Sequence, residues 1–216
     1  EFVGVIQSSK ENLVGGHFLE IETYWKISPN VNISLNAEWD RTREVFQYVG
    51  TVSFKGVPRY ILSRLDHDYA CLQFGLDLNL SPNISLEYRG RPYLSSARFS
   101  EFKRITDGEN PVFENRFERL DDELELTGGT YACDEDLDGT ADYSFDDPDF
   151  MYHSYKSNLV FRWEYRPGST IFLVWSQDNE AISEGNRIVP TESLRILREE
   201  IPYNVFLVKM SYRIGR

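Results

Sequence analysis

The sequence predicts an all-β chain, namely the C-terminal portion of an antiparallel up-and-down transmembrane β-barrel with an acidic extracellular insertion. Apolar and polar residues alternate with a period of two over several segments, which is the pattern of half-buried strands. Tight turn sequences separate these segments. No stretch reaches eighteen apolar residues and the mean hydropathy is -0.45, as expected for a barrel whose lumen face is wet.

The clearest strand is 31–41, in which every second residue is apolar. Its apolar face would consist of Val31, Ile33, Leu35, Ala37 and Trp39, with polar residues between them. Segments 70–80 and 157–166 alternate in the same way. Reading strands between turn signals gives about ten, at 1–8, 17–28, 31–41, 44–55, 58–66, 70–80, 84–103, 157–166, 169–178 and 203–214.

Three tight turns, at 28–30, 81–83 and 166–168, combine proline with asparagine or glycine and predict hairpins. Outer-membrane barrels keep short turns on the periplasmic side and long loops outside. Counted back from a periplasmic C-terminus, all three turns are periplasmic, provided that 84–103 is one strand kinked near Gly90. The long segments 104–156 and 179–202 are then extracellular.

The first residues resemble half of a strand and carry no signal peptide, so we expect residues 1–216 to be one barrel domain from a longer protein. Segment 104–156 would be a long acidic surface loop inserted between strands. Between 107 and 149 there are 16 acidic and 2 basic residues. This local charge argues against nucleic acid as a partner.

The insertion contains the pattern D-x-D-x-D-G-x-x-D, which resembles the first nine positions of an EF-hand calcium loop. The candidate metal ligands are Asp134, Asp136, Asp138, Thr140 through its carbonyl and Asp142 through water. Position twelve is Phe145, so the missing carboxylate would come from Asp146, Asp147 or Asp149. We expect a structural Ca²⁺; the alternative is a solvated acidic turn.

The stretches 51–69, 80–103, 134–145, 157–177 and 204–213, above all RWEYRPGSTIFLVWSQ, resemble an uncharacterised outer-membrane barrel family, domain of unknown function 5916. The resemblance implies a bacterial outer-membrane location. It also implies an upstream carbohydrate-binding module of family 9, and through that module a link to glycan handling. The family brings no established activity.

The sequence predicts no enzyme activity and no catalytic residues. The histidines His17, His67 and His153 lack ligand spacing and are expected at the surface. No G-x-S-x-G elbow is present. Carboxylate pairs exist, Glu20 with Glu22 and Glu87 with Glu164, but lumen-lining charge is the commoner reason for them.

Inward-facing charges are expected to pair across a polar lumen, and the residues concerned are Arg89, Arg91, Arg162 and Glu164. Cys71 and Cys133 show no CxxC spacing and would be able to pair at a cell surface.

We therefore expect a structural, transport or binding component of a Gram-negative outer membrane, in contact with lipid, with a glycan or small molecule as candidate ligand. The alternative is a soluble secreted β-sandwich that binds carbohydrate. The two differ at Ile33, Leu35, Leu86, Phe161, Trp163, Val208 and Met210, which face outward in a barrel and lie between sheets in a sandwich.

Overall fold

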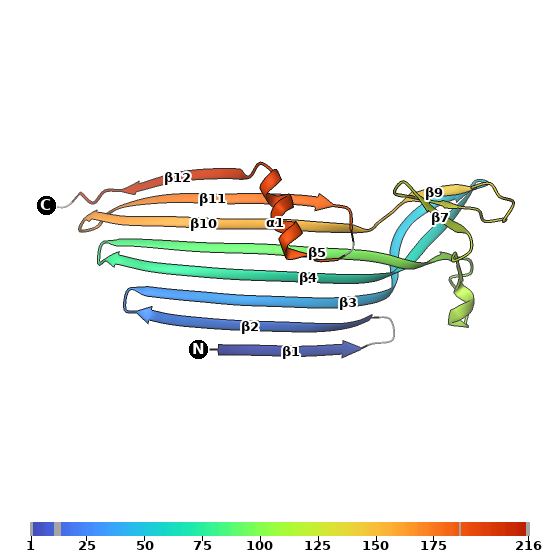
Figure 1. The fold of residues 1–216 in the computed structure, drawn as a ribbon, viewed down its shortest axis with the longest axis horizontal. Helices are drawn as coiled ribbons and strands as arrows, with labels where there is room; N and C mark the ends of the chain where they lie inside the picture. Colours follow the sequence, from blue (N-terminus) through green and yellow to red (C-terminus); the bar gives the residue numbers. More distant parts are fainter. Residues whose placement is uncertain (1, 11–13, 186, 215–216) are drawn as a thin grey trace.

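The computed structural model describes residues 2–10, 14–185 and 187–214 and confirms an all-β, antiparallel architecture (Figure 1). Eight long strands form an up-and-down meander in the order β1-β2-β3-β4-β5-β10-β11-β12. Their bounds are β1 Phe2–Lys10, β2 Val14–Ser28, β3 Val31–Phe54, β4 Val57–Ser81, β5 Ile84–Ile105, β10 Phe150–Arg166, β11 Ser169–Ser183 and β12 Tyr203–Ser211. Among the described strands β1 and β12 are not paired with each other, so the sheet is open.

Two strand breaks predicted from the sequence are wrong. Segments 31–41 and 44–55 form one strand of 24 residues, and 58–66 and 70–80 form one of 25. The polar residues near these predicted breaks continue the ladder, because Arg43 pairs in register with Asp66 and their side chains form an ion pair of 2.8 Å. Cross-strand charge pairs of this kind stabilise a sheet rather than interrupt it.

The three predicted hairpin turns lie together at one end of the sheet, where β2 meets β3, β4 meets β5 and β10 meets β11 (Figure 1). The opposite end carries the connection from β5 to β10 and the short β3–β4 turn. In that turn Lys55 and Gly56 both have positive φ, 49° and 80°. Two left-handed residues match the twist of a two-residue hairpin.

Between β5 and β10 the chain forms a second layer at this far end. It contains η1 Phe113–Arg116, β6 Phe117–Arg119, β7 Leu124–Thr127, β8 Thr130–Cys133 and β9 Tyr143–Asp146. β6 pairs with β5, whereas β7, β8 and β9 form their own sheet. The core of the molecule lies here, and its buried members are Ile61, Phe102, Leu120, Cys133 and Tyr143.

Segment 179–202, expected to be a loop, includes a helix, α1 Pro190–Glu199. Proline at its first turn favours helix initiation, and Ser193 and Leu197 form its buried side. His153 of β10, predicted at the surface, is only 1% exposed and bonds Ser183 at 2.8 Å, because α1 packs against β10 and β11 here. None of the helices in the described part of the chain has the length and apolar character needed to cross a membrane.

Candidate functional site

One face of the long sheet carries a band of apolar residues from β2 to β12, here called the apolar band. A single cross-strand row runs through seven strands in register, and its members are Trp25, Ile33, Leu76, Tyr88, Leu159, Trp175 and Phe206. The rings of Trp175 and Phe206 stack with centroids 5.9 Å apart. Strand alternation thus places apolar side chains of separate hairpins on one surface.

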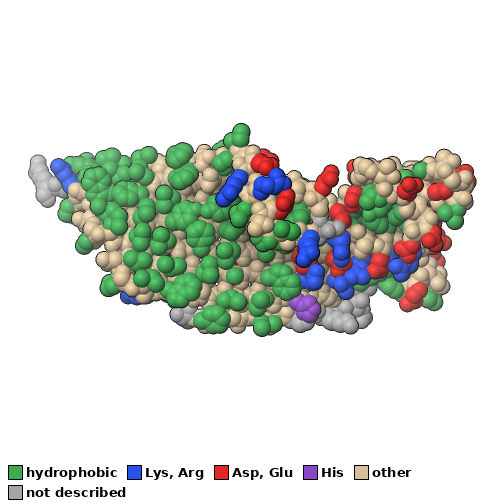
Figure 2. Space-filling model, in the orientation of Figure 1, with side chains coloured by type: hydrophobic (Ala, Val, Ile, Leu, Met, Phe, Trp, Pro, Cys, Tyr) green, Lys and Arg blue, Asp and Glu red, His purple; other side chains and the backbone are tan. Residues whose placement is uncertain are grey.

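This apolar face is open over most of its length. None of Ile33, Leu35, Leu86, Phe161, Trp163, Val208 and Met210 is buried, and the last two are 71% and 62% exposed. Figure 2 shows hydrophobic side chains covering the part of the face away from the insertion. In the described ranges no second sheet covers it, because β7, β8 and β9 lie beyond its end (Figure 1).

The apolar band has the height of a bilayer core. It covers nine residues of β3 (31–39) and eleven residues each of β4 (70–80) and β5 (84–94). A strand needs about 9–11 residues to cross a membrane. All four tryptophans of the chain lie on this face, with Trp39 at one border and Trp163 at the other. Tryptophan is enriched at such borders.

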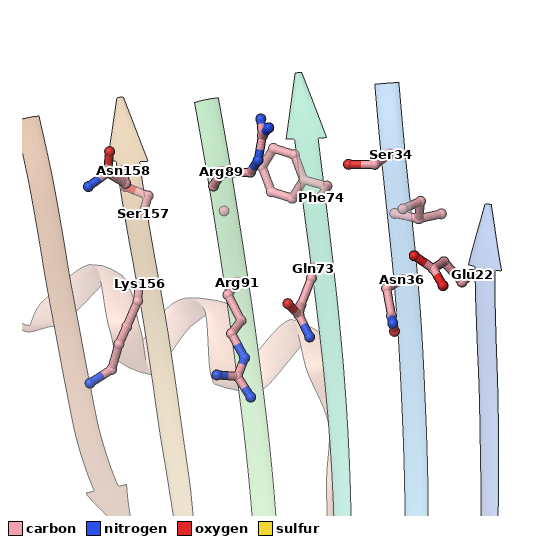
Figure 3. Close-up of a pocket in the computed structure, with 12 residues that line it drawn as sticks. Glu22, Ser34, Asn36, Gln73, Phe74, Arg89, Arg91, Lys156, Ser157 and Asn158 are labelled. Atoms are coloured by element: carbon pink, nitrogen blue, oxygen red, sulfur yellow. The ribbon is translucent and has the colours of Figure 1, made fainter. Parts of the chain in front are cut away.

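The opposite face is mainly polar from β2 to β10, where it is hollowed, and it carries apolar residues such as Val174 and Leu207 toward β12. A space of about 480 Å³ is lined by side chains of five strands, including Glu22, Asn36, Gln73, Arg91 and Lys156 (Figure 3). Asn36 Nδ2 donates to Glu20 Oε1 at 2.8 Å, and Lys156 Nζ pairs with Glu180 at 2.6 Å. The hollow therefore contains both hydrogen-bond donors and hydrogen-bond acceptors.

Arg89, Arg91, Arg162 and Glu164 were predicted to form ion pairs across a lumen. Their observed contacts are with residues on the same or the adjacent strand. Arg162 and Glu164 form an ion pair of 2.9 Å. Arg89 instead meets Asp77 at 2.6 Å, and Arg91 donates to the sulfur of Cys71 at 3.2 Å.

A buried arginine links the insertion to the sheet. The side chain of Arg104, at the far end of β5, is 6% exposed and meets Glu118, Glu123 and Glu135 at 2.8, 3.0 and 3.1 Å. Arg59 of β4 holds Glu135 through two further nitrogens, at 3.0 and 2.8 Å. A buried guanidinium requires such compensation. The sequence does not predict this cluster, because no local pattern identifies Glu118, Glu123 and Glu135 as partners of Arg104.

Burial and pairing set the titration of groups in this cluster. The hydrogen bonds from Arg59 keep the pKa of Glu135 below its usual value. Burial raises the pKa of the Cys133 thiol to about 11, so it stays protonated at neutral pH. Both Cys71 and Cys133 are free thiols.

The aspartates of the predicted calcium loop converge. One carboxylate oxygen each from Asp134, Asp136 and Asp138 lies within 4.8 Å of the others. Asp134 also accepts hydrogen bonds from the amides of Asp138 and Gly139, at 3.1 and 2.8 Å. Gly139, with φ of 91°, permits the turn that brings these residues together.

The other predicted ligands take part in hydrogen bonds that involve backbone amides. Asp142 Oδ2 accepts from the amides of Glu135 and Asp136, at 2.9 and 3.3 Å, so this oxygen faces the backbone. The amide of Thr140 donates to Asp138 at 2.9 Å. Asp149, one candidate for the missing carboxylate, accepts instead from the amide of Phe99 at 2.6 Å.

Comparison with known proteins gives one match. The family model described as Domain of unknown function (DUF5916) matches residues 3–215. No curated protein matches the chain, and no solved structure matches it.

Proposed function

The chain belongs to the family Domain of unknown function (DUF5916), and from the two faces of its sheet we propose that it forms part of the wall of a β-barrel in a bacterial outer membrane. The observation that carries this proposal is the exposed apolar band. It crosses seven strands and has the height of a bilayer core. In water such a surface would be an aggregation site.

The polar face supports a role in binding or passage of a polar solute. In a barrel wall this face lines the lumen, and the hollow offers donors from Arg91, Gln73 and Lys156 and acceptors from Glu22 and Asn158. A glycan or another hydroxyl-rich small molecule fits such a mixed set. The role proposed is structural or transport-related and involves no catalysis.

We also propose that the loop at Asp134, Asp136 and Asp138 holds a structural calcium ion. Three carboxylate oxygens within 4.8 Å of one another form a hard oxygen set, which suits Ca²⁺. The loop belongs to the acidic insertion at the end of the sheet opposite the tight turns, which would be extracellular (Figure 1). The cation would offset the mutual repulsion of the carboxylates.

A secreted carbohydrate-binding sandwich would bury the apolar band beneath a second sheet. The part of the chain that the structure describes provides no such sheet over the band. We therefore favour lipid as the material in contact with it.

The proposal is tested by placing arginine on each face of β3. Leu35→Arg puts a charge in the apolar band, whereas Asn36→Arg puts it on the polar face beside Glu20 and Glu22. In vesicles we expect Leu35→Arg to lower the free energy of unfolding by about 2–4 kcal/mol, and Asn36→Arg to change it little. Urea titration followed by tryptophan fluorescence measures both. Equal effects of the two variants would contradict a lipid-facing band.

A further inference from the structure

A belt of arginines borders the apolar band on the same face of the sheet. Arg41 and Arg43 follow Trp39 on β3, Arg64 lies on β4, and Arg98 lies on β5. Arg187, before α1, reaches the same place. Figure 2 shows basic side chains gathered where the hydrophobic area ends. The belt therefore lies at the level of lipid headgroups in the proposed barrel.

Two aspartates beneath the belt hold the arginines in place. Asp66, whose side chain is 8% exposed, meets Arg43, Arg64 and Arg98 at 2.8, 3.3 and 3.4 Å. Asp68 meets Arg41 at 2.9 Å. The carboxylates lie inward while the side chains of Arg41, Arg43 and Arg98 remain 54%, 56% and 51% exposed. The guanidinium groups are therefore anchored by carboxylates and still accessible to solvent.

The belt carries more positive than negative charge. Its five arginines face Asp66, Asp68 and Glu101, which binds Arg64 at 2.7 Å. Each guanidinium has five N–H donors, and one aspartate shared by three arginines cannot engage all of them. Some N–H donors of the arginines, and part of their positive charge, are therefore available to bind an external anion.

A hollow in the belt has room for that anion. It measures about 460 Å³ and is lined by Trp39, Arg41, Asp66, Asp68, Arg98 and Arg187, with Ile188 beside them. Trp39 links it to the apolar band. An occupant would thus have an anionic group among the arginines and an apolar part along the band.

We propose that this hollow binds the phosphate group of a membrane lipid headgroup, specifically that of the phosphorylated glycolipid of the outer leaflet. The inference rests on the proposed function, because it needs the band to be in lipid. Arginine forks match phosphate oxygens in two-point hydrogen bonds. Trp39 lies where indole rings favour the headgroup boundary.

The test compares lipid A with dephosphorylated lipid A on the full chain in detergent micelles, with native mass spectrometry as the readout. The wild type should retain lipid A preferentially. Arg41→Gln with Arg98→Gln should weaken that retention about tenfold, and Arg64 and Arg43 still compensate Asp66 in this variant. Arg166→Gln with Arg213→Gln removes equal charge at the tight-turn end and should leave the preference intact.

A second variant guards against misfolding. Arg41→Lys with Arg98→Lys keeps the charge but loses the fork geometry, so an intermediate retention supports the inference. Equal retention of both lipids by the wild type, or competition by inorganic phosphate as strong as that by lipid A, would overturn it. A separate measurement, insertion of the wild type into lipid vesicles, tests the proposed barrel itself, and failure to insert would refute the barrel independently of lipid A binding.

Discussion

Gly90 has neighbours that explain why glycine is needed in the middle of the apolar band. A Cβ atom added here would lie 2.5 and 2.6 Å from two ring atoms of Phe74, the cross-strand partner. The ring covers the glycine and fills the surface that a side chain would occupy. Gly75 has a matching role on the polar face, where Ser34 and Arg89 approach it.

Gly90→Ala should therefore destabilise the sheet, because Phe74 must move. We expect a loss of about 1–3 kcal/mol in the free energy of unfolding, measured by urea titration in vesicles. Gly50→Ala is the matched control, since nothing lies within 4 Å of a Cβ at that position. Equal stability of the two variants would show that the Phe74–Gly90 contact is not tight.

Glu135 makes the attachment of the insertion sensitive to acid. Its pKa is lowered by the hydrogen bonds from Arg59, so its stabilising contribution is full above the unfolded value of about 4.3 and is lost as the pH falls through the folded pKa. We expect proteolysis of the insertion to increase below about pH 4 in the wild type.

In Glu135→Gln the increase in proteolysis at low pH should be smaller. The insertion should already be cleaved more easily at neutral pH, because Arg104 and Arg59 lose a carboxylate partner. An unchanged pH profile in this variant would assign the acid sensitivity to other groups.

Single residues were predictable where the partners are close in sequence. The spacing of Asp134, Asp136 and Asp138 sufficed to predict that they converge. The partners of Arg104 and the burial of His153 depend on how distant segments pack. No local pattern contains that information.

At the scale of strands, the period of two predicted which residues share a face, because alternation is fixed by backbone geometry. Strand ends were harder to predict. The polar stretches around Arg43 and Asp66 resemble turns, but each provides the charge that the other needs across β3 and β4. Helix α1 was missed because only one turn of it is buried against the sheet, at Ser193 and Leu197.

The acidic loop between β8 and β9 is the element that calcium should order. Adding Ca²⁺ should slow proteolysis of the insertion, and a chelator should reverse this, because the cation offsets carboxylate repulsion. Asp136→Asn should weaken the effect, whereas Asp122→Asn, in the same insertion but outside the trio, should not. Protection that is identical in both variants, or absent in the wild type, would leave the loop as a solvated acidic turn.

At the scale of the whole molecule, the sheet presents two open edges. Within the described ranges, β1 and β12 each pair with a single neighbour, and β12 is exposed along its whole length, with Phe206 and Val208 74% and 71% exposed. Unpaired edges of this kind recruit further strands. The proposed barrel would close only through strands that pair with β1 and β12, and the alternation within a strand does not predict their number.

Quenching of tryptophan fluorescence by lipids brominated along their acyl chains tests whether the apolar band faces lipid. Trp25, Trp39, Trp163 and Trp175 all lie on the apolar face and are 44%, 38%, 43% and 38% exposed. If the band faces lipid, brominated vesicles should quench most of the emission while aqueous iodide quenches little. Strong quenching by iodide with no effect of bromine would contradict a membrane wall. The apolar band would then face water or a soluble partner instead of lipid.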